Sequence, residues 1–300
     1  MVRIGVVVAV VLVALASLPG SGGAGGTVRC YGRVATVVGT DGPETLAGTS
    51  GSDVIMGLGG DDTINAGGGR DWICPGAGAD TVHAGNGSDE IDASDGNDAI
   101  DGGAGQDFIS FYNAPGGATA SLASGVSTGW GSDTLDLIEG IVGSPFGDTF
   151  TGNGGDNQIE GRGGGDVLLG GGGNDLLLPG PGTDTVKGGP GFDYSIYWRA
   201  GRGITASLTT RQATGEGIDR FTAIEGLGGS DHPDVLTGNG AGNGILGYNG
   251  NDRLIGKGGN DFMYGGNGRD YLNGGTGDDY VNGEAGTDTC VSAERRHSCP

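Results

Sequence analysis

Apolar side chains recur at every ninth residue over most of this chain, usually two places after an aspartate. Written as nonapeptides, the chain contains three uninterrupted runs, which cover residues 39–110, 143–196 and 229–291 with eight, six and seven units. The eighth position is apolar in 20 of the 21 units, the sixth is aspartate in 18 and the fourth is glycine in 18. Ser195 is polar at the eighth position, and Glu44, Asn157 and Asn243 replace aspartate at the sixth. A repeat this regular indicates one structural unit stacked many times.

Each nonapeptide fits a turn followed by a very short strand. Nine residues are too few for a helix–turn–helix unit, and frequent glycine opposes a helix. A turn of about six residues and a short strand would point the eighth side chain inward, and two units would form one coil with a strand on each side. Such coils stack at about 4.8 Å. The pattern therefore predicts an all-β fold: a parallel β-roll, or right-handed β-solenoid, with two repeats per coil.

Two stretches of equal length, 111–142 and 197–228, separate the three runs. A shift of 86 residues aligns them without a gap, so that "TASL" at 119–122 falls on "TASL" at 205–208. The match continues into the repeats, where "TGNG" occurs at 151–154 and again at 237–240. Six nonapeptides and one insert were therefore duplicated together, and we expect the inserts to belong to the same architecture.

The aspartates of alternate units would stack along one edge of the roll, and those of the units between them along the other. Carboxylates about 5 Å apart repel each other strongly unless a cation lies between them. Ca²⁺ prefers several carboxylates together with backbone carbonyls, which glycine-rich turns expose. The candidate metal ligands are the sixth-position aspartates: Asp53, Asp62, Asp71, Asp80, Asp89, Asp98, Asp107, Asp148, Asp166, Asp175, Asp184, Asp193, Asp234, Asp252, Asp261, Asp270, Asp279 and Asp288.

A position inside such a ladder should matter more than one at its end. Asp71 stands between Asp53 and Asp89 on one edge, so it should contact two ions. Asp107 ends the same ladder and should contact one, unless the insert that follows adds another acid.

The nonapeptide resembles the GGxGxDxUx repeat of the RTX (hemolysin-type) calcium-binding family, which "GGNGRDYLN" at 265–273 matches at every specified position. The resemblance implies a β-roll in which each Ca²⁺ lies between turns eighteen residues apart. Sixth-position aspartates of both turns and nearby glycine-turn carbonyls would be its ligands. With an N-terminal signal and cysteines near both ends, the chain looks more like the small Sec-exported calcium-binding repeat proteins of actinobacteria.

The ends of the chain indicate export. Arg3 and the apolar stretch 4–16 have the form of a signal peptide over 1–16, too short for an ordinary membrane span, and no later apolar run could cross a bilayer. We expect a secreted protein with an N-terminal cap over 17–38 and a closed tail over 292–300. Four cysteines allow three pairings, and short sequence separation favours Cys30–Cys74 and Cys290–Cys299.

Composition and net charge indicate which classes of binding partner to expect. The chain holds 73 glycines in 300 residues and a formal net charge of −22. A polyanion is a poor partner for nucleic acid or an anionic membrane and a good one for cations. We therefore expect several bound calcium ions as the cofactor. A cell-surface or matrix partner stays open.

The sequence favours a binding protein without catalytic activity. Only about 22 residues lie between the signal peptide and the first repeat, which leaves no room for a catalytic domain. The nucleophile-elbow pattern G-x-S-x-G occurs once, as "GVSTG" at 125–129, but the second insert has Ala213 in place of Ser127. We predict a calcium-binding protein that folds on binding Ca²⁺ and has a structural or adhesive role. The alternative is an extracellular hydrolase or toxin-like protein.

Overall fold

The computed structural model describes residues 28–299, which form strands and turns without a helix. None of these residues therefore forms a helix that could cross a membrane. The predicted signal peptide 1–16 and the first part of the predicted cap, 17–27, lie outside the described residues.

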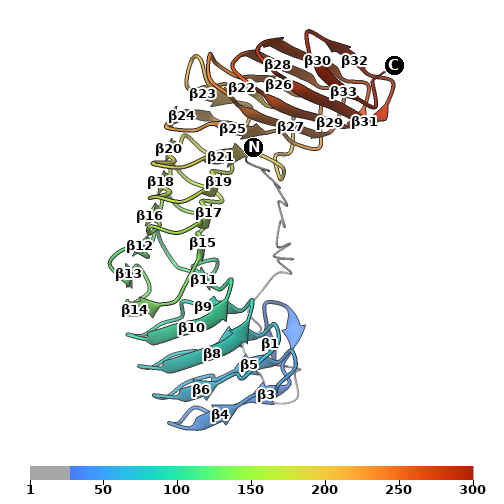
Figure 1. The fold of residues 1–300 in the computed structure, drawn as a ribbon. Helices are drawn as coiled ribbons and strands as arrows, with labels where there is room; N and C mark the ends of the chain where they lie inside the picture. The colour runs from blue at the N-terminus through green and yellow to red at the C-terminus, as the bar shows by residue number, and fades with distance from the viewer. Residues whose placement is uncertain (1–27, 300) are drawn as a thin grey trace.

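Most strands belong to two long sheets that face each other across the core, and the coils stack in sequence order along the molecule (Figure 1). Sheet I contains β3 (Val37–Val38), β5 (Val54–Met56), β7 (Trp72–Cys74), β9 (Glu90–Asp92), β11 (Phe108–Ser110), β15 (Gly140–Val142), β17 (Gln158–Glu160), β19 (Leu176–Leu178), β21 (Tyr194–Ile196), β25 (Gly226–Gly228), β27 (Gly244–Asn249), β29 (Phe262–Gly268), β31 (Tyr280–Gly286) and β33 (Arg295–His297). Sheet II contains, in order of pairing, β4 (Thr45–Ala47), β6 (Thr63–Asn65), β8 (Thr81–Gly87), β10 (Ala99–Gly105), β14 (Ser132–Asp136), β13 (Val126–Thr128), β12 (Thr119–Ser121), β16 (Thr149–Thr151), β18 (Val167–Leu169), β20 (Thr185–Lys187), β24 (Ile218–Thr222), β23 (Gln212–Thr214), β22 (Thr205–Ser207), β26 (Val235–Thr237), β28 (Arg253–Gly258), β30 (Tyr271–Thr276) and β32 (Thr289–Val291).

Within a run, neighbouring strands are parallel and paired eighteen residues apart, as Ile55 with Ile73 in sheet I and Ile64 with Val82 in sheet II. One nonapeptide therefore contributes to sheet I and the next to sheet II. The predicted β-roll with two repeats per coil is confirmed.

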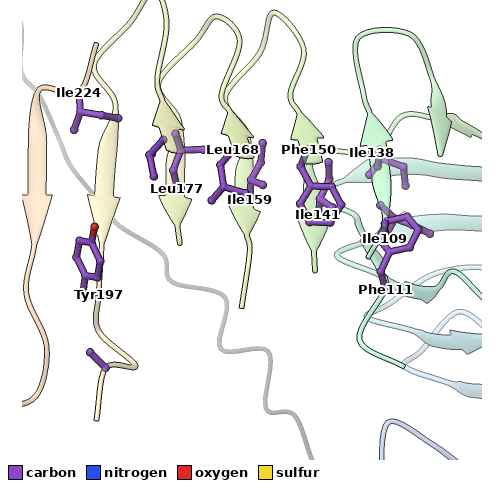
Figure 2. Packing of buried hydrophobic residues seen from close by; sticks show 14 of the residues in the cluster. Ile109, Phe111, Ile138, Ile141, Phe150, Ile159, Leu168, Leu177, Tyr197 and Ile224 are labelled. Carbon is purple, nitrogen blue, oxygen red and sulfur yellow. The ribbon is translucent and has the colours of Figure 1, made fainter. Parts of the chain in front are cut away.

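The eighth-position side chains fill the interior between the sheets. Ile109, Ile159, Leu168 and Leu177 follow one another in this core, all fully buried (Figure 2). Every nonapeptide but the one that contains Ser195 thus supplies a buried apolar side chain at its eighth position, because the middle residue of its strand points inward. The core is long but only one side chain deep from each sheet.

Both inserts continue the sheets. In the first insert, β14 pairs parallel to β10, β13 pairs antiparallel to both β14 and β12, and β12 pairs parallel to β16. The insert then returns to sheet I through β15, which lies between β11 and β17. The second insert repeats this arrangement with β22, β23, β24 and β25. The core is therefore continuous through both inserts.

A disulfide joins each end of the described chain to the roll. The hairpin of β1 (Arg29–Cys30) and β2 (Arg33–Val34) is linked to β7 by Cys30–Cys74. At the other end, Cys299 is linked to Cys290, which is buried at the eighth position of the last nonapeptide. These are the two pairings that short sequence separation favours. Strand β33 of the tail adds one further strand to sheet I.

Candidate metal centre

The sixth-position aspartates form hydrogen-bonded ladders along both edges of the roll. The Oδ1 atom of each interior aspartate accepts a backbone N–H from the residue eighteen places earlier, at 2.7 Å from Asp53 to Asp71 and 2.8 Å from Asp62 to Asp80. Alternate units thus lie on opposite edges, as the sequence predicted. This bond orients each carboxylate toward the same point of the coil.

The second oxygen of these carboxylates, Oδ2, differs from ordinary buried oxygens because most of these atoms have no hydrogen-bond partner among the described residues. In fifteen of the eighteen candidate aspartates it is buried and has no hydrogen-bond partner in the described part of the chain: Asp62, Asp71, Asp80, Asp89, Asp98, Asp107, Asp166, Asp175, Asp184, Asp193, Asp252, Asp261, Asp270, Asp279 and Asp288. Buried polar atoms are normally hydrogen-bonded. Fifteen such oxygens at one repeated position therefore indicate a site for a ligand that accepts their lone pairs.

The other three candidates, Asp53, Asp148 and Asp234, are the first aspartates of their runs. The Oδ2 atom of Asp148 accepts the backbone N–H of Ser144 in its own turn at 2.8 Å, and Asp53 and Asp234 are held in the same way. Their oxygens are already satisfied by protein donors. They begin a ladder without offering a free oxygen to it.

Burial raises the pKa of many of the ladder carboxylates. Asp71 is completely buried, and its pKa is raised to about 7 chiefly by burial and further by the neighbouring carboxylates of Asp89 and Asp53. The backbone N–H of Asp53 acts in the opposite direction. Asp184, close to Asp219, has its pKa raised to about 8. The charged ladder is thus unfavourable at neutral pH without a counter-charge.

Where the first position of the nonapeptide is glycine, a backbone carbonyl lies beside the free carboxylate oxygen. At Gly57, an added Cβ would collide with both the Asp62 Oδ2 atom and the carbonyl oxygen of Pro75, which belongs to the next coil on that edge. The same pair of neighbours recurs at Gly247, with Asp252 and Gly265. In these units, glycine at the first position keeps open the space in which carboxylate and carbonyl oxygens meet.

These donors fit calcium. All are oxygens, some charged and some carbonyl, which is the set that Ca²⁺ takes. No three acidic, histidine or cysteine side chains converge within residues 28–299, so a cation at these edges would take its other ligands from the backbone. Calcium bound there would supply the positive charge between adjacent coils.

The inserts carry ladder acids that sequence reasoning missed. The backbone N–H of Asp98 donates to Asp133 Oδ1 at 3.1 Å, and that of Asp107 donates to Glu139 Oε2 at 3.0 Å. The insert therefore does add an acid after Asp107, which is the exception that the sequence analysis allowed, and Asp107 does not end its ladder. The remaining acids of this kind are Asp219, Glu225 and Glu294. The nonapeptide register does not reach them, so only the "IEG" shared by 138–140 and 224–226 could have drawn attention to Glu139 and Glu225, and no such motif surrounds Glu294.

The residues that replace aspartate also begin ladders. Asn157 Oδ1 accepts the N–H of Asn153 in its own turn at 2.7 Å, while its Nδ2 donates to the carbonyl of Glu139 at 3.3 Å. Asn243 is held in the same way, and Glu44 accepts the N–H of Thr40. At the two asparagine positions an amide fits because its Nδ2 group can donate to the backbone carbonyl that the preceding coil offers there.

The one nucleophile-elbow pattern lies in a strand. Ser127 is at the centre of β13, buried, and donates its hydroxyl to Asp133 Oδ2 at 2.6 Å. A nucleophile elbow requires an exposed serine on a sharp turn between a strand and a helix. Ser127 has neither feature, and it supports the ladder acid instead.

Comparison with known families agrees with this geometry. The family model for the RTX calcium-binding nonapeptide repeat (4 copies) matches residues 38–73, 76–109, 142–177, 228–263, 246–281 and 255–290, which together cover more than half of the chain. No curated protein gives a significant match. The chain therefore belongs to the RTX calcium-binding nonapeptide repeat family.

Proposed function

We propose that the protein is an exported calcium-binding β-roll that folds on binding calcium and has a structural or adhesive role. The observation that carries this proposal is the set of fifteen buried aspartate Oδ2 atoms without a hydrogen-bond partner among the described residues. Leaving such an atom unsatisfied is costly. A hard dication would satisfy it, and one ion for each oxygen would give about fifteen ions per chain.

Calcium is also expected to drive folding. At its eighth position a nonapeptide typically buries one apolar side chain, which is little for nine ordered residues, and the ladder carboxylates repel one another. Metal binding that occurs only in the folded state adds its free energy to folding. We expect affinities in the range of extracellular calcium modules, about 10⁻⁴ to 10⁻³ M.

Far-UV circular dichroism tests the coupling. With chelator the spectrum should be that of an unfolded chain, and about 10 mM Ca²⁺ should produce a β-rich spectrum. Mg²⁺ should substitute poorly, because it requires a smaller and more strictly octahedral site. A spectrum that does not change on adding Ca²⁺ would contradict the proposal.

Export is supported by the form of residues 1–16 and by the two disulfides, since disulfides persist in oxidising compartments. N-terminal sequencing of protein recovered from culture medium would test it, and the expected first residue is Ser17. Protein that retains residues 1–16 in the cell would argue against export.

The adhesive role predicts a partner that binds only the calcium-loaded form. A pull-down from culture medium, with and without chelator, would detect such a partner. A broad hydrolase screen with calcium present would address the alternative, an extracellular hydrolase or toxin-like activity.

A further inference from the structure

Three ladders end on a glutamate that lies outside any nonapeptide. The backbone N–H groups of Asp107, Asp193 and Asp279 donate to a glutamate Oε2 atom at 3.0, 3.1 and 2.9 Å. The acceptors are Glu139, Glu225 and Glu294. Each glutamate makes the bond that an aspartate Oδ1 atom makes inside a run, so each takes the place of the next ladder aspartate.

The three glutamates share a short turn. Two residues before each one stands a non-glycine residue in the left-handed region: Leu137 at φ 52°, Ala223 at φ 49° and Ser292 at φ 49°. Side chains are uncommon in that region. A left-handed residue recurs at these three equivalent points, which indicates that the three segments share one backbone conformation. We name this conformation the Glu turn: residues 137–139, 223–225 and 292–294.

The Glu turn also supplies a carbonyl. A Cβ added to Gly102 would collide with the Leu137 carbonyl and approach Asp107 Oδ2 to 3.0 Å. Gly188 and Gly274 have the corresponding neighbours in the other two Glu turns. This is the pairing of carbonyl and carboxylate that surrounds Gly57 inside a run.

A free buried oxygen is present at every Glu turn. The Oδ2 atoms of Asp107, Asp193 and Asp279 have no hydrogen-bond partner in the described chain, and all three side chains are completely buried. Inside a run, five residues separate the first-position carbonyl from the sixth-position carboxylate, whereas in the Glu turn only two do. The additional methylene of glutamate helps the shorter turn reach the same ladder position.

We propose that the three Glu turns complete calcium sites that the nonapeptide motif does not describe, each supplying one carboxylate and one carbonyl opposite the last aspartate of its ladder. This rests on the proposed calcium-binding function. These sites would extend the ladders on the edge that carries Asp107, Asp193 and Asp279 into both inserts and into the C-terminal tail. The inserts are then part of the metal-binding surface rather than interruptions of it.

The test counts bound ions. Glu139→Gln, Glu225→Gln and Glu294→Gln keep an oxygen that can accept the aspartate N–H and remove the charge. Equilibrium dialysis against ⁴⁵Ca²⁺, at a concentration that just saturates the parent protein, should show each single variant binding about one ion fewer and the triple variant about three fewer. The calcium midpoint of folding should rise in the same order. Asp136→Asn, an exposed acid of the first insert, is the matched control and should bind as the parent does.

The outcomes separate the two proposals. A parent protein that binds no calcium refutes the proposed function itself. A parent that binds calcium, with single and triple variants that bind as many ions as Asp136→Asn, refutes the Glu-turn sites alone. If the triple variant fails to fold, the single variants decide the matter by the same count.

Discussion

The two inserts satisfy the same buried ladder acid with hydroxyl groups from different positions. In the first insert, Ser127 donates to Asp133 Oδ2 at 2.6 Å. In the second, Ala213 stands where Ser127 would be, and the Tyr197 hydroxyl donates to Asp219 Oδ2 at 2.8 Å instead. The hydroxyl comes from β13 in the first insert and from the residue that follows β21 in the second, but the acid keeps its donor.

The core around Tyr197 accommodates this exchange. The equivalent residue in the first copy is Phe111, a completely buried phenylalanine. Ser195, the one polar eighth-position residue, lies with its Oγ 3.5 Å from the Tyr197 hydroxyl, where the first copy has Ile109. Ser195, the exception to the repeat pattern, thus contacts Tyr197, whose hydroxyl takes the role that the Ser127 hydroxyl has in the first insert.

Tyr197→Phe should therefore destabilise the calcium-loaded protein. The ring can remain in place, since Phe111 occupies the equivalent position, but the nearly buried Asp219 loses a donor. Removing a hydrogen bond to a charged buried group costs about 1.5–3 kcal/mol. Adding Ala213→Ser to Tyr197→Phe recreates the Phe111–Ser127 combination and should recover most of that loss.

Urea unfolding of the calcium-saturated protein measures this cycle. Tyr112→Phe is the control, because Tyr112 is partly exposed and its ring contact with the Arg162 guanidinium survives in phenylalanine. The control should change the free energy of unfolding by less than about 0.5 kcal/mol. The reasoning is refuted if Tyr197→Phe is equally harmless, or if the double variant is no more stable than Tyr197→Phe.

Three further results are expected. Asp71→Asn and Asp107→Asn should raise the calcium midpoint of folding by similar amounts, because Glu139 continues the ladder beyond Asp107; a markedly smaller shift for Asp107→Asn would mean that the ladder stops there. Reduction should loosen the last coil before the middle of the roll, so hydrogen exchange should accelerate first around Cys290 and Cys299, and uniform acceleration would contradict this. In chelator, circular dichroism should show more β-structure at about pH 5.5 than at about pH 8; identical spectra would refute this. The folded pKa of carboxylates such as Asp71, about 7, exceeds the unfolded value, so their contribution to metal-free stability is present below about pH 4 and is lost as pH rises through about 7.

Much of the site followed from spacing alone. Because two nonapeptides form one coil, residues eighteen apart must share an edge, and this spacing alone places Asp71 between Asp53 and Asp89. The same spacing places Ile55 beside Ile73 in the core. A fixed period leaves a single register in which the eighth-position side chains point inward, so fold class and ladder membership could both be predicted.

The limits of that prediction lie where the period breaks. Asp148 looks like any other sixth-position aspartate in sequence, but its Oδ2 atom is satisfied by Ser144 within its own turn. Conversely, Asp133 has no motif around it, yet it lies on the ladder because β14 pairs with β10. Spacing reports which residues share an edge and does not report which oxygens are already hydrogen-bonded.

The sequence by itself determined the β-roll, its two edges and the oxygen-rich chemistry along them, because all three depend on a local nine-residue period. Only the tertiary structure decided where each ladder begins and ends. Glu139 reaches Asp107 across 32 residues because β15 docks beside β11 and brings the Glu turn to the edge of the previous coil. Tyr197 likewise reaches Asp219 only through the packed core of the second insert. Such contacts join residues that have no fixed separation in the sequence, so they exist only once the sheets have paired.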